Sequence, residues 1–167
     1  MKKTTETKKT STRSKKIQPV PEGFGTVTPY LIVDGADELI DFITDAFEGE
    51  VVGMTRSDGD RVAHAGVRIG NSMIMISDIM DEMPPELAML YLYVEDADGT
   101  YSSALDAGAE SIREPKDEFY GDRAAAVKDR WGNKWWIATQ KEKVEGEELE
   151  RRAREANKKA REEHAAH

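Results

Sequence analysis

The middle of the chain repeats itself with an offset of about 61 residues. When residues 30–50 (YLIVDGADELIDFITDAFEGE) are laid over residues 91–111 (YLYVEDADGTYSSALDAGAES), seven of the 21 positions are identical. Average residue usage would give about one or two. With one more residue of offset, residues 61–77 match residues 123–139 at Arg, Ala, Arg, Gly and Asn. The repeat predicts two copies of one structural module.

Each copy is predicted to contain a strand, a helix and then three strands, from its alternating and helical patterns. The expected helices are 36–47 and 97–107; the expected strands are 26–33, 50–55, 62–69 and 72–77, and then 88–94, 110–113, 123–128 and 134–139. The dipeptides at 70–71 and 132–133 are both Gly-Asn, which favours two-residue hairpin turns. The expected fold class is α+β, with two βαβββ modules whose sheets each keep one face free of a helix.

Charge divides the chain into three parts. Residues 1–20 carry seven basic side chains and one acidic one, whereas residues 21–144 carry 11 basic and 25 acidic ones, a net charge of -14. The overall content of 38% hydrophobic and 34% charged residues is therefore an average over unlike segments. We interpret residues 1–21 as a disordered basic tail, residues 22–143 as the folded domain with repeats at 25–78 and 87–142, and residues 144–167 as a charged helix.

Composition also excludes classes of function. An acidic body does not suit a nucleic-acid groove, since phosphate binding needs a cationic surface, although the basic tail could make a weak contact with nucleic acid or simply keep the chain in solution. The sequence has no Cys, which excludes thiolate metal sites and fits a reducing cytoplasm. It has no apolar run of about 18 residues and no signal-peptide pattern. We expect a cytoplasmic protein without a membrane segment.

The C-terminal helix allows two interpretations. Oppositely charged residues recur four apart, as in Glu147 with Arg151 and Glu150 with Arg154. Its apolar stripe consists of one leucine and small residues: Leu149, Ala153, Ala156 and Ala160. The helix is either a partner-binding element or a solvated one.

Strand alternation predicts which side chains occupy the open faces. Leu31 and Val33 should pack beneath the first helix, which leaves Thr28, Tyr30 and Ile32 on the other side, with Met89, Tyr91 and Tyr93 at the matching positions of the second copy. By the repeat alignment Ile74 and Trp136 are equivalent, and Trp136 would face the open side. Tyr30, Tyr91, Tyr93 and Trp136 would then line a site for a flat or aromatic small molecule, or else fill a core.

Other residues suggest a rim for this site. The connection 114–122 carries Phe119 and Tyr120 beside a glycine, which suits a lid or a surface loop anchored by its own aromatics. Arg68 and Arg123 could meet an anionic group or form structural ion pairs. His64, the only histidine of the body, could act as a general base or a metal ligand, or be a hydrogen-bonded structural residue.

These segments resemble the glyoxalase/bleomycin-resistance/extradiol-dioxygenase superfamily, also called vicinal oxygen chelate, and in particular its PhnB-like branch. The resemblance rests on residues 30–50, on HAGVRIGNSMIMISD (64–78) and on EFYGDRAAAVKDRWGNKWWIAT (118–139), and it covers about residues 25–142. It implies that the two modules form an open, cup-shaped mixed sheet. It also implies a small ligand in the cup and a homodimer, sometimes with modules exchanged between chains.

The resemblance further implies where a metal would be held. The ligand positions of metal-dependent members fall at Thr28, at Ile74 or Met75, at Met89 and at Trp136. None of these is His, Asp or Glu, the residues that a catalytic divalent metal needs. We therefore expect no metal or other cofactor at the usual site.

Three functions follow as hypotheses. The first is a metal-free small-molecule-binding protein, with Tyr30, Tyr91, Tyr93 and Trp136 in the cup and Phe119, Tyr120 and Arg123 closing over it. The second is a metal-dependent lyase, isomerase or dioxygenase of the same superfamily with a displaced site around His64, joined by Asp78 or Glu118. The third is a dimeric scaffold whose basic tail touches nucleic acid.

Overall fold

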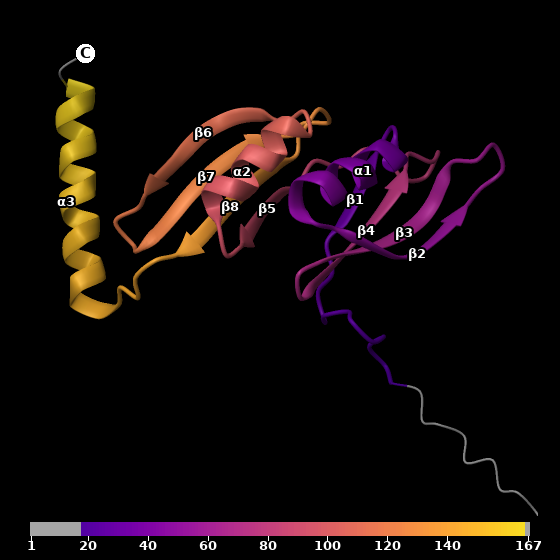
Figure 1. Cartoon of the computed structure of the whole chain (residues 1–167), viewed down its shortest axis with the longest axis horizontal. Helices are drawn as coiled ribbons and strands as arrows, with labels where there is room; N and C mark the ends of the chain where they lie inside the picture. The colour runs from indigo at the N-terminus through magenta and orange to yellow at the C-terminus, as the bar shows by residue number, and fades with distance from the viewer. Residues whose placement is uncertain (1–17, 166–167) are drawn as a thin grey trace, which may run out of the picture.

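The computed structural model describes residues 18–165. Of the tail predicted to be disordered, residues 1–21, the part up to residue 17 lies outside the described residues, and residues 18–21 lie in no helix or strand. Module 1 consists of β1 (Tyr30–Val33), α1 (Ala36–Phe47), β2 (Glu50–Arg56), β3 (Val62–Ile69) and β4 (Ser72–Asp78). Module 2 consists of β5 (Met89–Tyr93), α2 (Ala97–Asp106), β6 (Glu110–Asp117), β7 (Asp122–Lys128) and β8 (Lys134–Gln140). A third helix, α3 (Gly146–Ala165), follows module 2 (Figure 1).

The two modules have the same topology, which confirms the α+β fold predicted from the repeat. Each forms a four-stranded mixed sheet, in the orders β1-β4-β3-β2 and β5-β8-β7-β6. The first strand of each module pairs in parallel with the last, and the other pairs are antiparallel. A parallel pair needs a crossover, and the single helix of each module lies in that crossover.

The core lies between each sheet and its helix. Leu31 and Val33 of β1 are buried, as alternation predicted, and α1 buries a broad apolar face that includes Leu39 and Ile43. Ala125 and Val127 of β7 form the corresponding layer in module 2. The buried residues of α2 are Ala97, Tyr101 and Ala104, so Tyr101 is the large one among them. Small side chains on both α2 and β7 allow the helix to pack closely on the strand.

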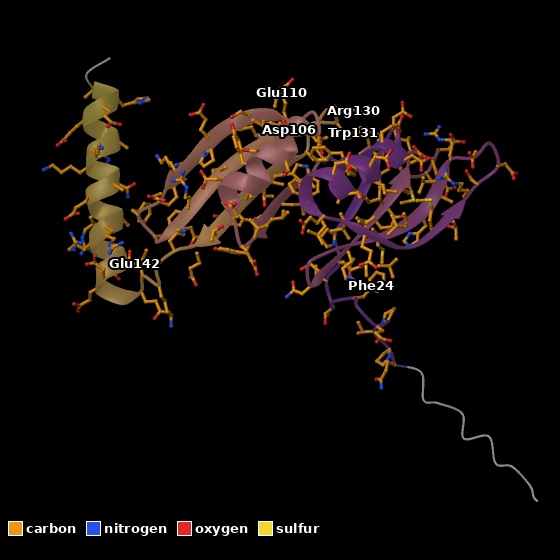
Figure 2. All side chains as sticks on the ribbon, viewed as in Figure 1. Phe24, Asp106, Glu110, Arg130, Trp131 and Glu142 are labelled. Atoms are coloured by element: carbon orange, nitrogen blue, oxygen red, sulfur yellow. The ribbon has the colours of Figure 1, made fainter. Side chains whose placement is uncertain are left out.

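Trp135 joins the two modules. Its fully buried ring belongs to β8, yet it packs on two residues of α1, with ring centroids 4.8 Å from Phe47 and 6.2 Å from Phe42. A second link comes from the β7–β8 connection, where Trp131 Nε1 donates to the carbonyl oxygen of Asp34 at 2.8 Å. Figure 2 shows Trp131 and Arg130 at this junction. The modules therefore meet through their helix-covered sides.

The structure corrects one predicted turn, one predicted loop and one strand start. The β3–β4 hairpin has the expected two-residue turn, but β7 and β8 are joined by five residues, 129–133. The segment 114–122 is mostly strand, since β6 continues to Asp117 and only residues 118–121 form the turn. The first strand begins at Tyr30 rather than at residue 26.

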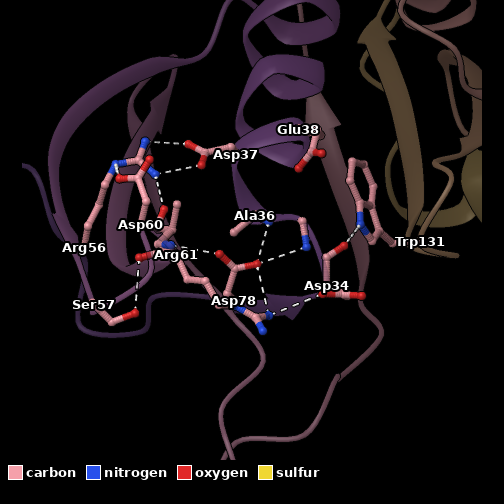
Figure 3. Close-up of polar contacts among 12 residues, drawn as sticks. Asp34, Ala36, Asp37, Glu38, Arg56, Ser57, Asp60, Arg61, Asp78 and Trp131 are labelled. Atoms are coloured by element: carbon pink, nitrogen blue, oxygen red, sulfur yellow. Dashed lines mark hydrogen bonds and ion pairs between the residues drawn. The ribbon is translucent and has the colours of Figure 1, made fainter.

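Asp78 fixes the start of α1. Its carboxylate accepts hydrogen bonds from the backbone N–H groups of Gly35, Ala36 and Val62 at 2.8–3.0 Å, and Arg61 lies 3.6 Å away (Figure 3). Burial by itself would raise the pKa of Asp78. The donors of Ala36, Val62 and Gly35, with the charge of Arg61, outweigh that influence and hold the pKa below its ordinary value.

This depressed pKa predicts a pH-dependent contribution to stability. The unfolded pKa is about 3.9, so the contribution of ionised Asp78 is present above that value and is lost as the pH falls through the lower, folded pKa. We expect the difference in unfolding free energy between the wild type and Asp78→Asn to shrink between about pH 6 and about pH 3. Urea titrations at several pH values measure it, and a pH-independent difference would contradict this role.

Helix α3 is held mainly by ion pairs near its start. Arg152 binds Glu142 before the helix and Glu148 within it, and Arg151 binds Glu148 and Glu155. No residue of this helix is buried. Figure 1 shows it beyond module 2, away from module 1. Among the described residues, no helix combines the length and the apolar character needed to cross a membrane.

Candidate functional site

The candidate site is the open face of module 2, the sheet face opposite α2. One register row crosses all four strands on this face: Tyr91 of β5 is opposite Trp136 of β8, Trp136 is opposite Ala126 of β7, and Ala126 is opposite Arg113 of β6. Two aromatic rings thus stand at one end of the row and a guanidinium group at the other. The small side chain of Ala126 between them lets Arg113 reach the aromatic ring.

The aromatic side chains form a continuous surface. The rings of Tyr91 and Trp136 are nearly parallel, with an interplanar angle of 5° and centroids 6.1 Å apart. The Tyr93 ring lies 5.3 Å from that of Tyr91. Tyr91 is 41% exposed and Tyr93 is 66% exposed. A large aromatic surface that remains accessible is typical of a binding site rather than of a core.

Charged groups border this surface. The guanidinium carbon of Arg113 lies 5.6 Å from the centroid of the Trp136 ring, which is a cation–π distance, and the same group forms an ion pair with Glu118. The side chain of Glu118 is only 9% exposed. A buried carboxylate is costly without a partner, so Arg113 has two roles: it neutralises Glu118 and covers part of Trp136.

Tyrosine hydroxyl groups complete the border. Tyr93 Oη donates to Asp122 Oδ2 at 2.9 Å, and this hydrogen bond, together with partial burial, raises the pKa of Tyr93. Burial and a hydrogen bond with Tyr91 raise the pKa of Tyr120. These phenols therefore stay protonated at neutral pH. The Tyr93 proton is committed to Asp122, so the Tyr93 hydroxyl can offer a ligand only its oxygen, as an acceptor.

The open face of module 1 has a different character. Its matching row consists of Tyr30, Met75, Gly66 and Gly53, on β1, β4, β3 and β2. His64 lies on the same face, with Nδ1 3.3 Å from the hydroxyl oxygen of Tyr30. Two of the four positions in this row have no side chain. Gly66 and Gly53 therefore form a bare stretch of backbone, the glycine floor, beside the Tyr–His pair.

The structure brings together some of the predicted site residues. Tyr91, Tyr93, Trp136 and Tyr120 gather on the open face of module 2, and Phe119 packs edge-on against Tyr120 at 5.2 Å. Tyr30 belongs to the open face of module 1. Arg68 also lies on the module 1 face, in the strand position opposite Met73, and forms an ion pair with Glu50 at 2.5 Å.

Arg123 does not lie where the sequence interpretation put it. It is opposite Thr139 on the helix-covered side, and its guanidinium group binds Asp98 in the first turn of α2 and Asp117 of β6. The prediction that Arg123 closes over the cup is therefore wrong, and Arg123 is not part of the candidate site. Arg113 takes that place instead. The position of Arg113 follows from the pairing of β6 with β7 and from no sequence signal. Arg123 was chosen instead because it is identical to Arg61 in the repeat alignment, whereas Arg113 has no identical counterpart.

The displaced metal site around His64 is not assembled within one chain. His64 faces the open side of module 1, whereas Asp78 faces α1 and Glu118 belongs to module 2. Ile74 also turns out to be buried in the core under α1, and the residue opposite Tyr30 is Met75. In the described part of the chain, no three His, Cys, Asp or Glu side chains gather as a metal site would require. The donors Thr28, Met75, Met89 and Trp136 do not fit a catalytic divalent metal.

Comparisons with known proteins agree with this architecture. The family model described as Glyoxalase/Bleomycin resistance protein/Dioxygenase superfamily matches residues 23–137. The chain belongs to this superfamily. Superfamily membership accounts for the two βαβββ modules, and α3 and the basic tail lie outside the matched residues.

Individual relatives of this superfamily protein are distant. It is 29% identical over 135 residues to an uncharacterized protein of Mycobacterium tuberculosis (strain ATCC 25618 / H37Rv), a match that covers 74% of this chain and 79% of that protein. The crystal structure of TioX from Micromonospora sp. ML1 is similar, with a TM-score of 0.56 and 17% identity, covering 68% of this chain and 98% of TioX. A PhnB protein from Bacillus cereus, described as a putative 3-demethylubiquinone-9 3-methyltransferase, has the same TM-score and identity and covers 69% and 99%. These two likenesses show the shared fold.

Proposed function

We propose that this superfamily protein, a member of the PhnB-like branch, binds a small, flat, aromatic molecule in a cup. The observation that carries the proposal is the nearly parallel Tyr91–Trp136 pair on an exposed sheet face. A flat ring of a ligand can stack on this pair. Stacking between the rings then adds to the hydrophobic free energy gained when the ligand ring leaves water. The likeness to the Bacillus cereus PhnB structure supports the choice of branch.

Charge narrows the class of ligand. Glu118 and Asp122 are largely buried beside the aromatic surface, and residues 21–144 carry a net charge of -14. Arg113 is already paired with Glu118. The field over the site is therefore negative, which favours neutral or cationic aromatic molecules over anionic ones.

We further propose that two copies complete the cup. In the described part of the chain, the open face of module 2 keeps a large exposed apolar area: Met89 and Tyr93 on β5 are 63% and 66% exposed. Apolar area of this kind normally becomes an interface or a ligand site. The open face of module 1 from one copy would cover that of module 2 from the other, enclosing the ligand between the two faces. The absence of cysteine supports a cytoplasmic location for this dimer.

Replacing Trp136 with alanine tests the proposed function. A library of flat heteroaromatic compounds screened by thermal shift should yield a ligand that stabilises the wild type, by about 2.7 kcal/mol at 100 times its dissociation constant. Trp136→Ala should weaken the binding of that compound by about tenfold or more, because the stacked ring is lost. Trp136→Phe, which retains a flat ring, is the matched control and should keep most of the affinity.

Two results would count against the proposal. The first is a compound that stabilises the wild type and Trp136→Ala equally, which would place its site elsewhere. The second is sedimentation showing a monomer both with and without the bound compound, which would remove the shared cup. Tyr91→Ala should behave like Trp136→Ala, since its ring forms the other half of the pair.

A further inference from the structure

The N-terminal arm, residues 18–28, leads onto the open face of module 1. Figure 2 shows Phe24 on the far side of module 1 from Trp131. Phe24 Cζ lies 3.7 Å from the position that a Cβ atom on Gly66 would occupy, and Met73 Sδ lies at the same distance from it. The phenyl ring therefore rests over the backbone of Gly66.

The glycine floor consists of Gly66 and Gly53, and the Phe24 ring covers the Gly66 part. Gly66 of β3 and Gly53 of β2 are register partners, and a Cβ atom on Gly53 would meet no atom within 4 Å. At the matching positions in module 2 the chain carries Ala126 and Arg113. Glycine inside a strand weakens it, and often marks a place where another group approaches the backbone closely. Two paired glycines on the open face therefore indicate a seat for a flat group.

The arm itself is weakly held. Within residues 18–27, the backbone hydrogen bond given by the structure runs from Phe24 N to the Pro21 carbonyl oxygen, and Thr28 Oγ1 bonds back to Gly25. These bonds are internal to the arm. Phe24 stands between Gly23, which has a φ of +83°, and Gly25. Glycines on both sides let the backbone rotate, so the phenyl ring can leave the floor without breaking a strand.

We propose that the Gly53–Gly66 floor is the seat for a flat ring of the ligand, and that Phe24 is a built-in competitor for that seat. This inference rests on the proposed function and adds to it the place where the ligand ring lies in module 1. His64 and Tyr30 at the edge of the floor would hydrogen-bond a polar atom on the ring. Ligand binding would then require the arm to move away from the glycine floor. Because Phe24 occupies this floor in the absence of ligand, it lowers the apparent affinity of the protein for the ligand.

Quinoline, a flat two-ring molecule that is neutral near pH 7.5, is a suitable probe. It would be titrated into the full-length ¹⁵N-labelled protein while ¹⁵N–¹H spectra are recorded. We expect the amide resonances of Gly53 and Gly66 to shift, because a ring stacked on the backbone perturbs them. Phe24→Ala should bind quinoline about tenfold more tightly than the wild type, which corresponds to about 1.4 kcal/mol. Val27→Ala, an exposed residue of the same arm, should bind it like the wild type.

A second variant fills the floor itself. Gly53→Val adds a side chain where the structure has open space on a strand, so the variant should fold as the wild type does. It should remove the quinoline-dependent shift at Gly66. Its spectrum also reports directly whether the protein is folded.

The outcomes separate this inference from the proposed function. Shifts confined to the Trp136 and Tyr91 signals would overturn the glycine seat and leave the proposed function standing. Equal or weaker binding by Phe24→Ala would overturn the role of Phe24 as a competitor. No shift on either open face at millimolar quinoline would overturn both the seat and the proposed function.

Discussion

Replacing Trp135 with alanine is expected to lower the free energy of unfolding by about 3–5 kcal/mol. The indole is fully buried, packs on Phe42 and Phe47 of α1, and donates from Nε1 to Asp129 at 2.9 Å. Removing it leaves a cavity at the junction of the two modules, and such a cavity collapses only in part. Urea unfolding monitored by circular dichroism measures the loss.

The neighbouring tryptophan provides the matched control. Trp136 points to the open face, so Trp136→Ala should cost about 1 kcal/mol or less, since the ring is partly in water already. A comparable loss of stability in both variants would contradict the assignment of the two rings to opposite faces. Of the two tryptophan variants, Trp136→Ala is the one that should weaken binding of the aromatic ligand while the protein stays folded.

Replacing Asp129 with asparagine should also destabilise the fold, by about 3 kcal/mol. The carboxylate is 2% exposed and accepts four hydrogen bonds at 2.9–3.0 Å, from Trp131 N, Asn133 N, Asn133 Nδ2 and Trp135 Nε1. Oδ1 and Oδ2 each accept two of these donors. An amide has only one acceptor oxygen, so two buried donors would face an NH₂ group.

An exposed carboxylate is the control for this substitution. Asp106, at the end of α2, is exposed, and Asp106→Asn should change the unfolding free energy by less than about 0.5 kcal/mol. If Asp129→Asn were as stable as Asp106→Asn in urea, the carboxylate would not be organising the β7–β8 connection. The consequence extends beyond module 2, because that connection carries Trp131 to its bond with Asp34.

Much of the fold could be predicted from the sequence. Helix α1 has the predicted limits, and β3 does as well, because a clear apolar period and a Gly-Asn turn mark them. The duplication predicted the shared topology of the two modules, since equivalent sequences bury equivalent faces. Tyr91 and Trp136 were also placed correctly on one face, because alternation along a strand depends only on local geometry.

Register across strands could not be predicted in the same way. The repeat alignment made Ile74 equivalent to Trp136, but Ile74 faces α1, and Met75 occupies the position opposite Tyr30. A shift of one residue moves a side chain to the other face of a sheet. The shift arises because the β7–β8 connection has five residues where β3–β4 has two, and Asp129 stabilises the longer one.

The sequence by itself determined the two βαβββ modules, the acidic body and the aromatic residues available for a site, because these depend on local periodicity and composition. Only the tertiary structure decided that Arg113 rather than Arg123 borders Trp136, that Gly53 and Gly66 pair to make a bare floor, and that Phe24 rests on it. The physical reason is that each of these contacts joins residues distant in the chain. Strand pairing and packing bring them together, and no local pattern encodes that pairing.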